Sequence, residues 1–527
     1  MLRKLLLLFC TVLSCKAVAQ FQWINGPSGY SYSDHAVTLD SYDPGNYPGG
    51  IDFSATAIDK NGDLYIYGGL KGTPSYTLWK YDKSINQWKA FSKYHWGSHY
   101  GTVGIEDSLN SPGFSRNGVM WFDNNGYLWL HDNDENPPYV TDRIWRYNPA
   151  TNYWTIWSGF PTTTSYPVYS PLGVPTAAAH PGKRYEAMHW ADTLGNLWVY
   201  GGYNPFAWGD FSEDLWKFDI QLKQWSWEGG TQMGGPLYWD PPKYGAKGIF
   251  SSYSFPARRS SAFCWTDQQN KLWFFGDSSP GSYNSLWCYD PAIHQWAWFG
   301  GDTLNYPNQG SYNDYCVAAS SNLPGPRFEF EQINQHYNQN KCGLWLFGGR
   351  SRVDADNWYY RDLWFYRFKD NKWILVQGDD LMPAPTALQS SGSMGGRVAT
   401  TLWDDNNGTL YLFGGNYYSD IWTYKYDKDC ICGIEPPAIT IPNVFTPNND
   451  GINDLFKTSV ERYENFDLTI YNRWGEIVFK TLDPDGSWDG KKNGLDCSEG
   501  TYYYIIDVYD AQKKKTENFK GFISLIR

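Results

Sequence analysis

Short apolar-aromatic runs of strand length recur along most of the chain, separated by segments rich in turn-forming residues. Between Asn196 and Gly230, three such runs occupy residues 197–200, 215–218 and 224–227. The glycine pair Gly201-Gly202 follows the first run and lets the backbone bend without a Cβ in the way. The pattern predicts three antiparallel strands.

The same pattern occurs six times. Its copies begin LYIYGG at Leu64, LWLHD at Leu128, LWVYGG at Leu197, LWFFGD at Leu272, LWLFGG at Leu344 and LYLFGG at Leu410. The period is about 70 residues, and a Leu-Trp or Ile-Trp strand and then usually a further Trp-bearing strand follow each start. A single copy cannot bury both of its faces, so the repeats predict a closed ring of packed sheets.

The order of residues within a copy resembles the kelch repeat. In the first copy a glycine pair (Gly68-Gly69) is followed by Tyr81-Asp82 and then by Trp88. Two copies depart from it, with His131-Asp132 and Gly276-Asp277 in place of the glycine pair. Kelch repeats usually span about 50 residues, so about 20 extra residues lie in connections here. The resemblance implies an all-β, six-bladed kelch-type propeller over residues 20–429.

The two ends of this region predict how the ring closes. Residues 21–26 resemble the fourth strand of other copies, such as residues 224–229, whereas the sixth copy has no Trp-bearing strand after Tyr426. We therefore expect residues 21–26 to supply the outer strand of the sixth blade, which hides both edges.

The first residues have the features of a secretory signal peptide at 1–19. Arg3 and Lys4 precede an apolar run at residues 5–13, and Ala17-Val18-Ala19 provides a cleavage site. Lipoprotein processing at Cys15 is the alternative. No later stretch has the length of a membrane helix, so we expect a secreted or surface-attached protein. The net charge of -12 argues against a nucleic-acid partner.

Beyond a linker at residues 430–438 the repeat stops, and residues 439–527 contain strand patterns of their own. These lie at residues 468–472, 476–480, 501–509 and 521–526 and predict a small Ig-like β-sandwich. The motifs in this tail are NVFTPNNDGIND from Asn443, IYNRWG from Ile470, WDGK from Trp488, GTYYY from Gly500 and KGF from Lys520. Together they resemble the gliding-motility-associated C-terminal domain, a type B sorting signal of the type IX secretion system of Bacteroidetes. The resemblance implies export across the outer membrane, with the secretion machinery as partner.

Candidate binding residues lie where topology gathers the long connections. In a four-stranded meander, the loop between the second and third strands and the loop to the next sheet emerge on one side. We expect function on that face. Four tryptophans outside the repeated positions suit stacking on sugar rings: Trp96, Trp208, Trp239 and Trp358. The alternative is that they pack over the loops.

Arginines recur just before the first strand of most copies and would surround the mouth of the channel. They are Arg116, Arg184, Arg259, Arg327 and Arg397. Guanidinium groups in that position could hold an anionic ligand. Structural pairing with neighbouring Asp or Glu is the favoured alternative.

Catalytic and metal-binding signals are weak. The eight histidines show no ligand spacing, and no GxSxG or phosphate loop is present. Kelch propellers include the copper enzyme galactose oxidase, but Tyr94-His95 has no matched partners, so we expect neither copper nor an enzyme. Four oxygen-bearing residues, Asn448, Asp450, Asn453 and Asp454, resemble part of a calcium loop. Because the distal Glu is missing, Asx turns are the alternative.

Seven cysteines remain after signal removal, an odd number, and the sequence leaves their pairing open. The favoured function is an exported binding module for glycan or surface polymer, without a cofactor. A protein-binding scaffold for adhesion or gliding is the alternative, and an enzyme on complex carbohydrate is a third.

Overall fold

The computed structural model describes residues 21–27, 34–50, 54–69, 75–91, 99–113, 115, 118–132, 143–159, 166–204, 210–232, 241–277, 283–303, 310–328, 342–350, 358–378, 382–383, 394–416, 418–433, 438–461, 463–510 and 515–527. The chain divides into two compact units, Met1–Cys432 and Gly433–Arg527. Residues 1–20, with the predicted signal peptide and Cys15, lie outside the described residues. Across the described ranges, no helix is long and apolar enough to cross a membrane.

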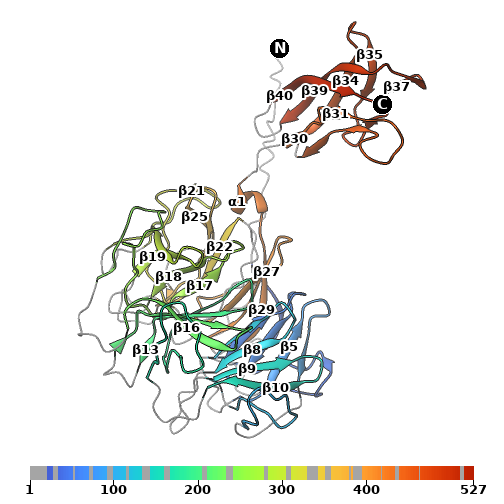
Figure 1. The fold of residues 1–527 in the computed structure, drawn as a ribbon. Coiled ribbons are helices and arrows are strands. Elements are labelled where there is room, and N and C mark those ends of the chain that lie inside the picture. Colours follow the sequence, from blue (N-terminus) through green and yellow to red (C-terminus); the bar gives the residue numbers. More distant parts are fainter. Residues whose placement is uncertain are drawn as a thin grey trace, which may run out of the picture. The chain divides into compact units, whose positions relative to one another are not determined.

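Six antiparallel sheets of four or five strands form the described part of the first unit (Figure 1). The first sheet contains β2 (Tyr42–Asp43), β3 (Ala55–Ile58), β4 (Leu64–Tyr67), β5 (Leu78–Asp82) and β6 (Gln87–Ala90). The second contains β7 (Val119–Phe122), β8 (Leu128–Asp132), β9 (Arg143–Asn148) and β10 (Tyr153–Ser158). The third contains β11 (Met188–Ala191), β12 (Leu197–Tyr200), β15 (Leu215–Asp219) and β16 (Gln224–Gly229).

The remaining large sheets follow the same plan. The fourth contains β17 (Phe263–Thr266), β18 (Leu272–Asp277), β19 (Tyr283–Asp290) and β20 (Gln295–Gly300). The fifth contains β21 (Ala318–Ala319), β22 (Gly343–Phe347), β24 (Leu363–Arg367) and β25 (Lys372–Gln377). The sixth contains β1 (Gln22–Asn25), β27 (Thr401–Asp404), β28 (Thr409–Gly415) and β29 (Tyr418–Lys425). Two further two-stranded sheets pair β13 (Tyr203–Asn204) with β14 (Asp210–Phe211) and β23 (Trp358–Tyr359) with β26 (Met382–Pro383).

The apolar strands are explained by burial on both faces of each sheet. In β4, Leu64 and Ile66 pack in a cluster with the sixth sheet, whereas Tyr65 and Tyr67 pack in a cluster with the second. Clusters of this kind join every consecutive pair of sheets and also the sixth to the first. Burial of aromatic side chains on this scale dominates core energetics. The packing therefore runs around a closed cycle, and the predicted all-β propeller architecture is confirmed.

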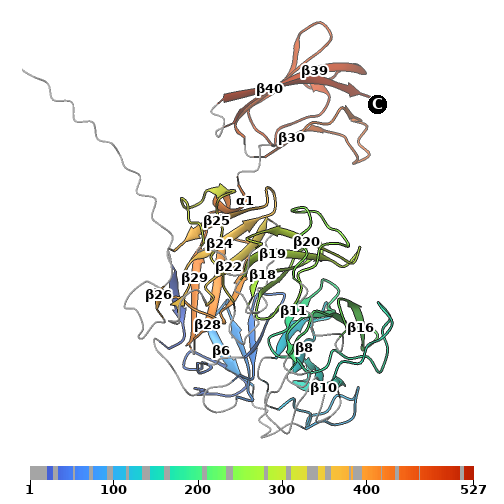
Figure 2. The ribbon, with the colours of Figure 1, turned by 90° about the vertical axis from the view of Figure 1, so that its left-hand side faces the viewer.

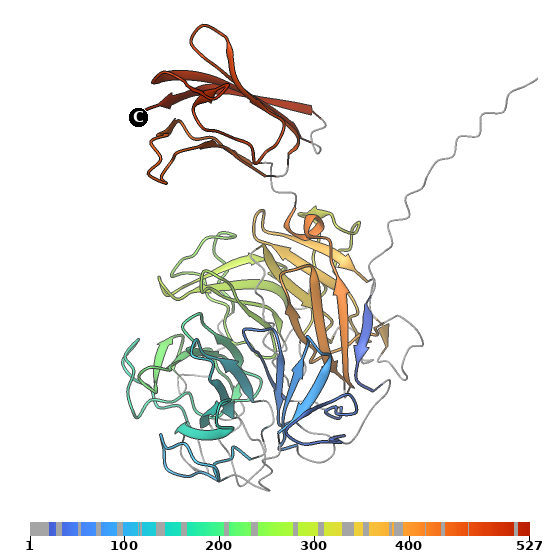
Figure 3. The same cartoon turned by 90° about the vertical axis from the view of Figure 1, so that its right-hand side faces the viewer.

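The two ends of the first unit pair in one sheet. Strand β1 is antiparallel to β29, with Trp23 opposite Trp422. The blue β1 lies beside the orange β29 in both Figure 2 and Figure 3. The ring of Phe21 packs 5.1 Å from that of Tyr424 and 5.4 Å from that of Phe347. Residues 22–25 thus form the outer strand of the sixth sheet, as the sequence led us to expect.

The extra residues of the long repeat form a recurrent structure that we call the edge segments, residues 34–50, 99–113, 166–182, 241–256 and 310–326. Each segment closes on itself through a paired bridge, such as His99 with Ser111. Each also bonds to the outer strand of its own sheet, as Asp107 does to Trp154. In three of the five edge segments, a buried asparagine also donates a hydrogen bond to the outer strand. One of them is Asn110, whose Nδ2 donates to the carbonyl of Trp154 at 2.9 Å. The edge segments therefore cover strand edges that would otherwise invite pairing with other chains.

Two disulfides within the described residues attach the end of the first unit to the fifth sheet. The short helix α1 (Lys428–Cys432) holds Cys430, bonded to Cys316 in an edge segment, and Cys432, bonded to Cys342 beside β22. Among the described residues, Cys288 and Cys497 are free thiols. Residues 430–432 thus belong to the first unit, although we placed them in the linker, because disulfide partners are not visible in sequence.

The second unit is a β-sandwich around a core that includes Phe445, Leu468, Trp488 and Ile523. Its main sheet has the order β31-β40-β39-β34-β35, and only the β31 and β40 pair is parallel. These strands are β31 (Val444–Phe445), β34 (Glu464–Tyr471), β35 (Ile477–Thr481), β39 (Gly500–Asp510) and β40 (Lys515–Leu525). The shorter strands are β30 (Ala438–Thr440), β32 (Phe456–Lys457), β33 (Ser459–Glu461), β36 (Ser487–Trp488), β37 (Lys491–Lys492) and β38 (Leu495–Asp496). A C-terminal β-domain is thus confirmed.

Candidate functional site

The recurrent arginines lie in buried ion pairs. In the third and fifth sheets, an arginine pairs with the aspartate just before the third strand, and in the sixth sheet it pairs with Asp420 within β29. The Nη1 to Oδ1 distances are 2.7 Å for Arg184–Asp214, 2.6 Å for Arg327–Asp362 and 2.5 Å for Arg397–Asp420. Each Nη1 also donates to the first glycine carbonyl of the glycine pair, as Arg327 does to Gly348 at 2.9 Å. The kelch-like glycine pair and the arginine therefore belong to one local structure.

The fifth sheet shows how fully such a pair is satisfied. The Oδ2 atom of Asp362 accepts hydrogen bonds from Trp364 Nε1 at 2.7 Å, Tyr312 OH at 2.7 Å and Arg327 Nη2 at 2.8 Å. The Arg327 guanidinium also lies 3.7 Å from the ring centre of Tyr360. Burial opposes the charge on Arg327, but the facing Asp362 carboxylate outweighs it and raises the pKa of the guanidinium. The Arg327 guanidinium consequently keeps its charge although it is buried.

The two departures from the glycine pair are places where the acid has moved. In the fourth sheet Asp277 replaces the second glycine and pairs with Arg259, while Ser285 takes the place of the aspartate and accepts the Trp287 indole N–H at 3.1 Å. In the second sheet Asp132 again replaces a glycine, and it stands opposite Arg143 in register. Both of these residues are buried. A buried charge is tolerated only with a partner, and in the fourth sheet the acid has moved while Arg259 keeps its place and its ion pair.

These contacts match the pairing alternative of the sequence analysis. The described arginines donate hydrogen bonds to aspartates and backbone carbonyls. Binding of an anionic ligand by these arginines therefore stays a prediction. Arg116 lies outside the described residues. In the second sheet, Ser115 occupies the position that Arg259 occupies in the fourth sheet. In each case the backbone carbonyl of that residue lies against the first glycine of the preceding glycine pair.

Most of the predicted sugar-stacking tryptophans fall outside the described residues. These are Trp96, Trp208 and Trp239. The backbone of Trp358 pairs with Pro383 between β23 and β26, and nothing is described of its side chain. Their role stays a prediction.

The candidate calcium residues form a turn held by its own backbone. Asp454 Oδ1 accepts the amides of Asn448 at 3.0 Å and Asn449 at 2.6 Å, and its Oδ2 accepts that of Gly451 at 2.8 Å. Asp450 Oδ1 accepts the amide of Ile452 at 2.8 Å. Asx turns therefore account for this geometry, and Asn453 has the left-handed backbone common there. Across the described part of the chain, no group of three metal-ligating side chains is present. Calcium binding stays untested.

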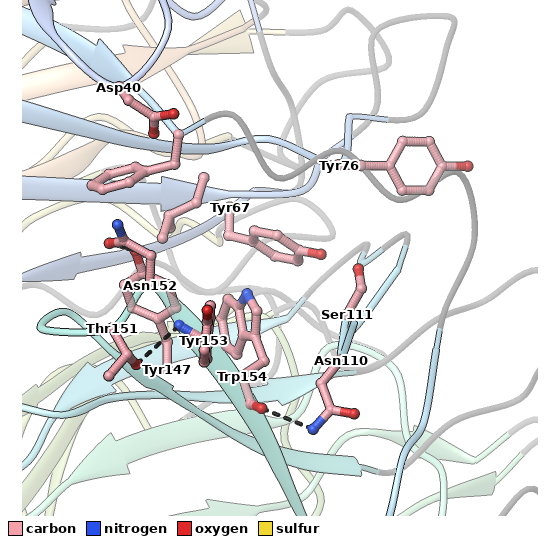
Figure 4. A pocket seen from close by; sticks show the side chains of 12 residues that line it. Asp40, Tyr67, Tyr76, Asn110, Ser111, Tyr147, Thr151, Asn152, Tyr153 and Trp154 are labelled. Atoms are coloured by element: carbon pink, nitrogen blue, oxygen red, sulfur yellow. Dashed lines mark hydrogen bonds between the residues drawn. The ribbon is translucent and has the colours of Figure 1, made fainter. Parts of the chain in front are cut away.

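A cavity of about 210 Å³ lies between the first and second sheets (Figure 4). Its aromatic lining includes Tyr67 at the end of β4, Tyr147 in β9 and Trp154 in β10. The Trp154 ring centre is 5.4 Å from that of Tyr67 and 5.1 Å from that of Tyr147. All three are buried. They form a rigid aromatic floor.

The rim of the cavity is polar and more accessible. Asp40 and Thr151 are exposed, and Asn152 and Tyr153 are partly exposed. The amide oxygen of Asn152 accepts the Tyr147 hydroxyl at 2.7 Å, so its amide nitrogen is the group that can donate to a ligand. Burial raises the pKa of Tyr67 and of Tyr147, which keeps both hydroxyls neutral. Aromatic surface beside hydroxyl, amide and carboxylate groups is the combination that recognises a sugar ring.

No sequence pattern indicated this cavity. Its residues come from two sheets and two edge segments, and their proximity depends on how the sheets pack. One sequence feature does distinguish the first sheet, which borders the cavity, from the others. The first sheet lacks the arginine, and Thr77 stands at the register position that Asp214 holds in the third.

Two protein families match parts of the chain. The Kelch motif matches residues 60–93, which include β4 to β6. The CHU_C Type IX secretion signal domain matches residues 439–525. Comparison with curated proteins gave no match.

Among solved structures, the chain is similar to PorZ, described as an essential bacterial surface component of the type IX secretion system of Porphyromonas gingivalis. The identity is 15% over 92% of this chain and 52% of PorZ, with a TM-score of 0.31. The chain thus spans about half the length of PorZ, and at this TM-score we draw no functional conclusion from it. The family matches stand independently: the chain carries a kelch motif in its ring of antiparallel sheets and a CHU_C type IX secretion signal domain at residues 439–525.

Proposed function

We propose that the chain is exported by the type IX secretion system and that its first unit acts outside the cell as a binding module for glycan or surface polymer. The sorting domain at residues 439–525 supports the export route. The proposal includes no catalytic step and no cofactor. Its machinery partner is the type IX apparatus, and its ligand partner is a polysaccharide.

The observation that carries the binding proposal is the cavity between the first and second sheets. Its volume of about 210 Å³ suits a single sugar residue, which the buried ring of Trp154 and the polar rim would contact together. A long polymer would then place one sugar unit in the cavity, and its other units would remain outside the cavity.

The test is binding of the mature chain to a glycan array, followed by titration of the strongest glycan against two variants. Asn152→Gly removes the amide donor but keeps the left-handed backbone at φ 60°. We expect it to weaken binding about five- to thirtyfold, because the loss of one hydrogen-bond donor to the ligand costs about 1–2 kcal/mol.

Asn371→Gly is the matched control. Asn371 also has a left-handed backbone and accepts a tyrosine hydroxyl, that of Tyr366 at 3.2 Å, but it lies in the fifth sheet away from the cavity. Equal affinity of the two variants would refute the cavity as the site. No binding to any arrayed glycan would instead favour a protein-binding scaffold, and release of shortened glycan would favour an enzyme.

A further inference from the structure

The outer face of the main sheet in the second unit carries a row of exposed apolar side chains. Tyr471 of β34, Tyr503 of β39 and Phe522 of β40 are consecutive cross-strand partners, and Ile477 of β35 continues the row. The exposed fractions are 51% for Tyr503, 61% for Phe522 and 50% for Ile477. Trp474, in the turn after β34, is 74% exposed. We call these five residues the aromatic row.

The same strands provide an internal comparison. Four residues further along, the outer face presents Asp467, Asp507 and Asn518 as cross-strand partners. Asn518 Nδ2 donates to Asp507 Oδ1 at 2.5 Å, and Lys480 pairs with Asp467 at 2.9 Å. That polar row is what a sheet with one solvated face ordinarily shows. The aromatic row departs from this pattern, and exposed apolar patches mark interaction sites.

The charges beside the row indicate what kind of surface it fits. An open hollow of about 590 Å³ is lined by Tyr471, Tyr503 and Phe522, and its charged lining residues are Arg473 and Lys520. No carboxylate is among its described lining residues. The Arg473 guanidinium lies 4.6 Å from the ring centre of Trp474. A partner that presents apolar side chains next to carboxylates would complement both features.

We infer that the aromatic row is the surface by which the type IX export machinery docks this domain, through a protein face that is apolar and acidic. The inference rests on the proposed export function. A second copy of the chain is disfavoured, because symmetric contact would bring the Arg473 and Lys520 groups of both copies together. An anionic membrane is disfavoured because two cations are fewer than the clusters that bind such surfaces.

The test uses the full chain in a bacterium with a type IX system and measures the protein in the periplasm and outside the cell. The double variant Tyr503→Ser with Phe522→Ser should reduce export at least tenfold. The matched control is Asp507→Ser with Asn518→Ser, which changes the same two strands at the polar row and should export normally. Tyr503→Phe with Phe522→Tyr should restore export. Thermal unfolding of each purified variant reports whether the domain folds.

Charge reversal gives a test that leaves the apolar core untouched. Lys520→Glu should also lower export, because it places a carboxylate opposite the acidic partner. Normal export of both this variant and the serine double variant would overturn the inference. If the purified chain binds anionic vesicles and the serine double variant does not, the inference of a protein partner is overturned. Deletion of residues 439–527 separates the two proposals. Export of the truncated chain would refute the proposed route. If the deletion blocks export but the variants of the aromatic row are exported normally, only the docking surface is refuted.

Discussion

At the scale of single residues, the arginine-aspartate pairs show how a repeat tolerates variation. Each buried charge costs several kcal/mol unless a partner compensates it. The partner position is free to change as long as the two groups meet, as with Asp277 in place of a glycine and Ser285 in place of an aspartate. Irregular sequence at these positions thus preserves a regular structure.

Asp362→Asn tests this reasoning. The change leaves the Arg327 guanidinium buried without a compensating charge, so we expect a loss of about 3–5 kcal/mol in the free energy of unfolding. Asp370→Asn in the same sheet is the control, because its pair with Arg367 at 2.7 Å is partly exposed and contributes about 0–1 kcal/mol. Urea unfolding followed by tryptophan fluorescence measures both. Equal shifts would contradict the argument.

At the scale of elements, the edge segments and α1 attach loops to sheets. Asn322 Nδ2 donates to the carbonyls of Val317 at 2.7 Å and Trp373 at 3.0 Å, which satisfies a segment that would otherwise bury unpaired polar groups. The helix α1 is far too short to be stable alone. Its two cysteines hold it against the fifth sheet, so its stability comes from covalent and tertiary contacts.

Cys430→Ser tests the contribution of this attachment. The bond to Cys316 closes a separation of 114 residues, and loops of that length give about 5 kcal/mol in the chain-entropy description. We expect a lower Tm for the first unit and a smaller further drop on adding reductant than in the wild type.

The control for this experiment is Cys497→Ser, a free thiol in the second unit. It should leave the Tm of the first unit unchanged. A Cys430→Ser protein as stable as the wild type would show that the Cys342–Cys432 bond and packing are enough to hold α1.

At the scale of the whole first unit, closure of the ring removes the edges that an open stack of sheets would expose. The closing strand is short, so its energy is concentrated in few side chains. Phe21, which directly precedes β1, is 4% exposed, whereas Trp23 within β1 is 50% exposed. We therefore expect the buried ring of Phe21, and not the larger ring of Trp23, to contribute most of the stability of ring closure.

Phe21→Ala should therefore destabilise the first unit by about 3–5 kcal/mol, the usual cost of removing a buried phenylalanine. Trp23→Ala keeps the same backbone pairing with β29 and should cost about 1 kcal/mol. Thermal unfolding and the onset of aggregation, which an opened edge would accelerate, measure the difference. A larger effect from Trp23 would mean that the strand is held by its outer face.

Much of the fold was accessible from sequence because its signals are local. The apolar runs, the glycine pairs and the period predicted the sheets, and the resemblance between residues 21–26 and the fourth strands predicted the closing strand. The motifs from Asn443 to Phe522 identified the sorting domain by resemblance, and the family match at residues 439–525 agrees.

The sequence by itself determined the all-β architecture, the pairing of the two ends of the first unit and the nature of the C-terminal domain, since each depends on a repeated or contiguous pattern. Only the tertiary structure decided which aspartate faces each arginine, which cysteines join, and that Asp40, Tyr67 and Trp154 border one cavity. Those facts depend on contacts between distant segments, which are fixed by how the sheets pack and leave no periodic trace in the chain.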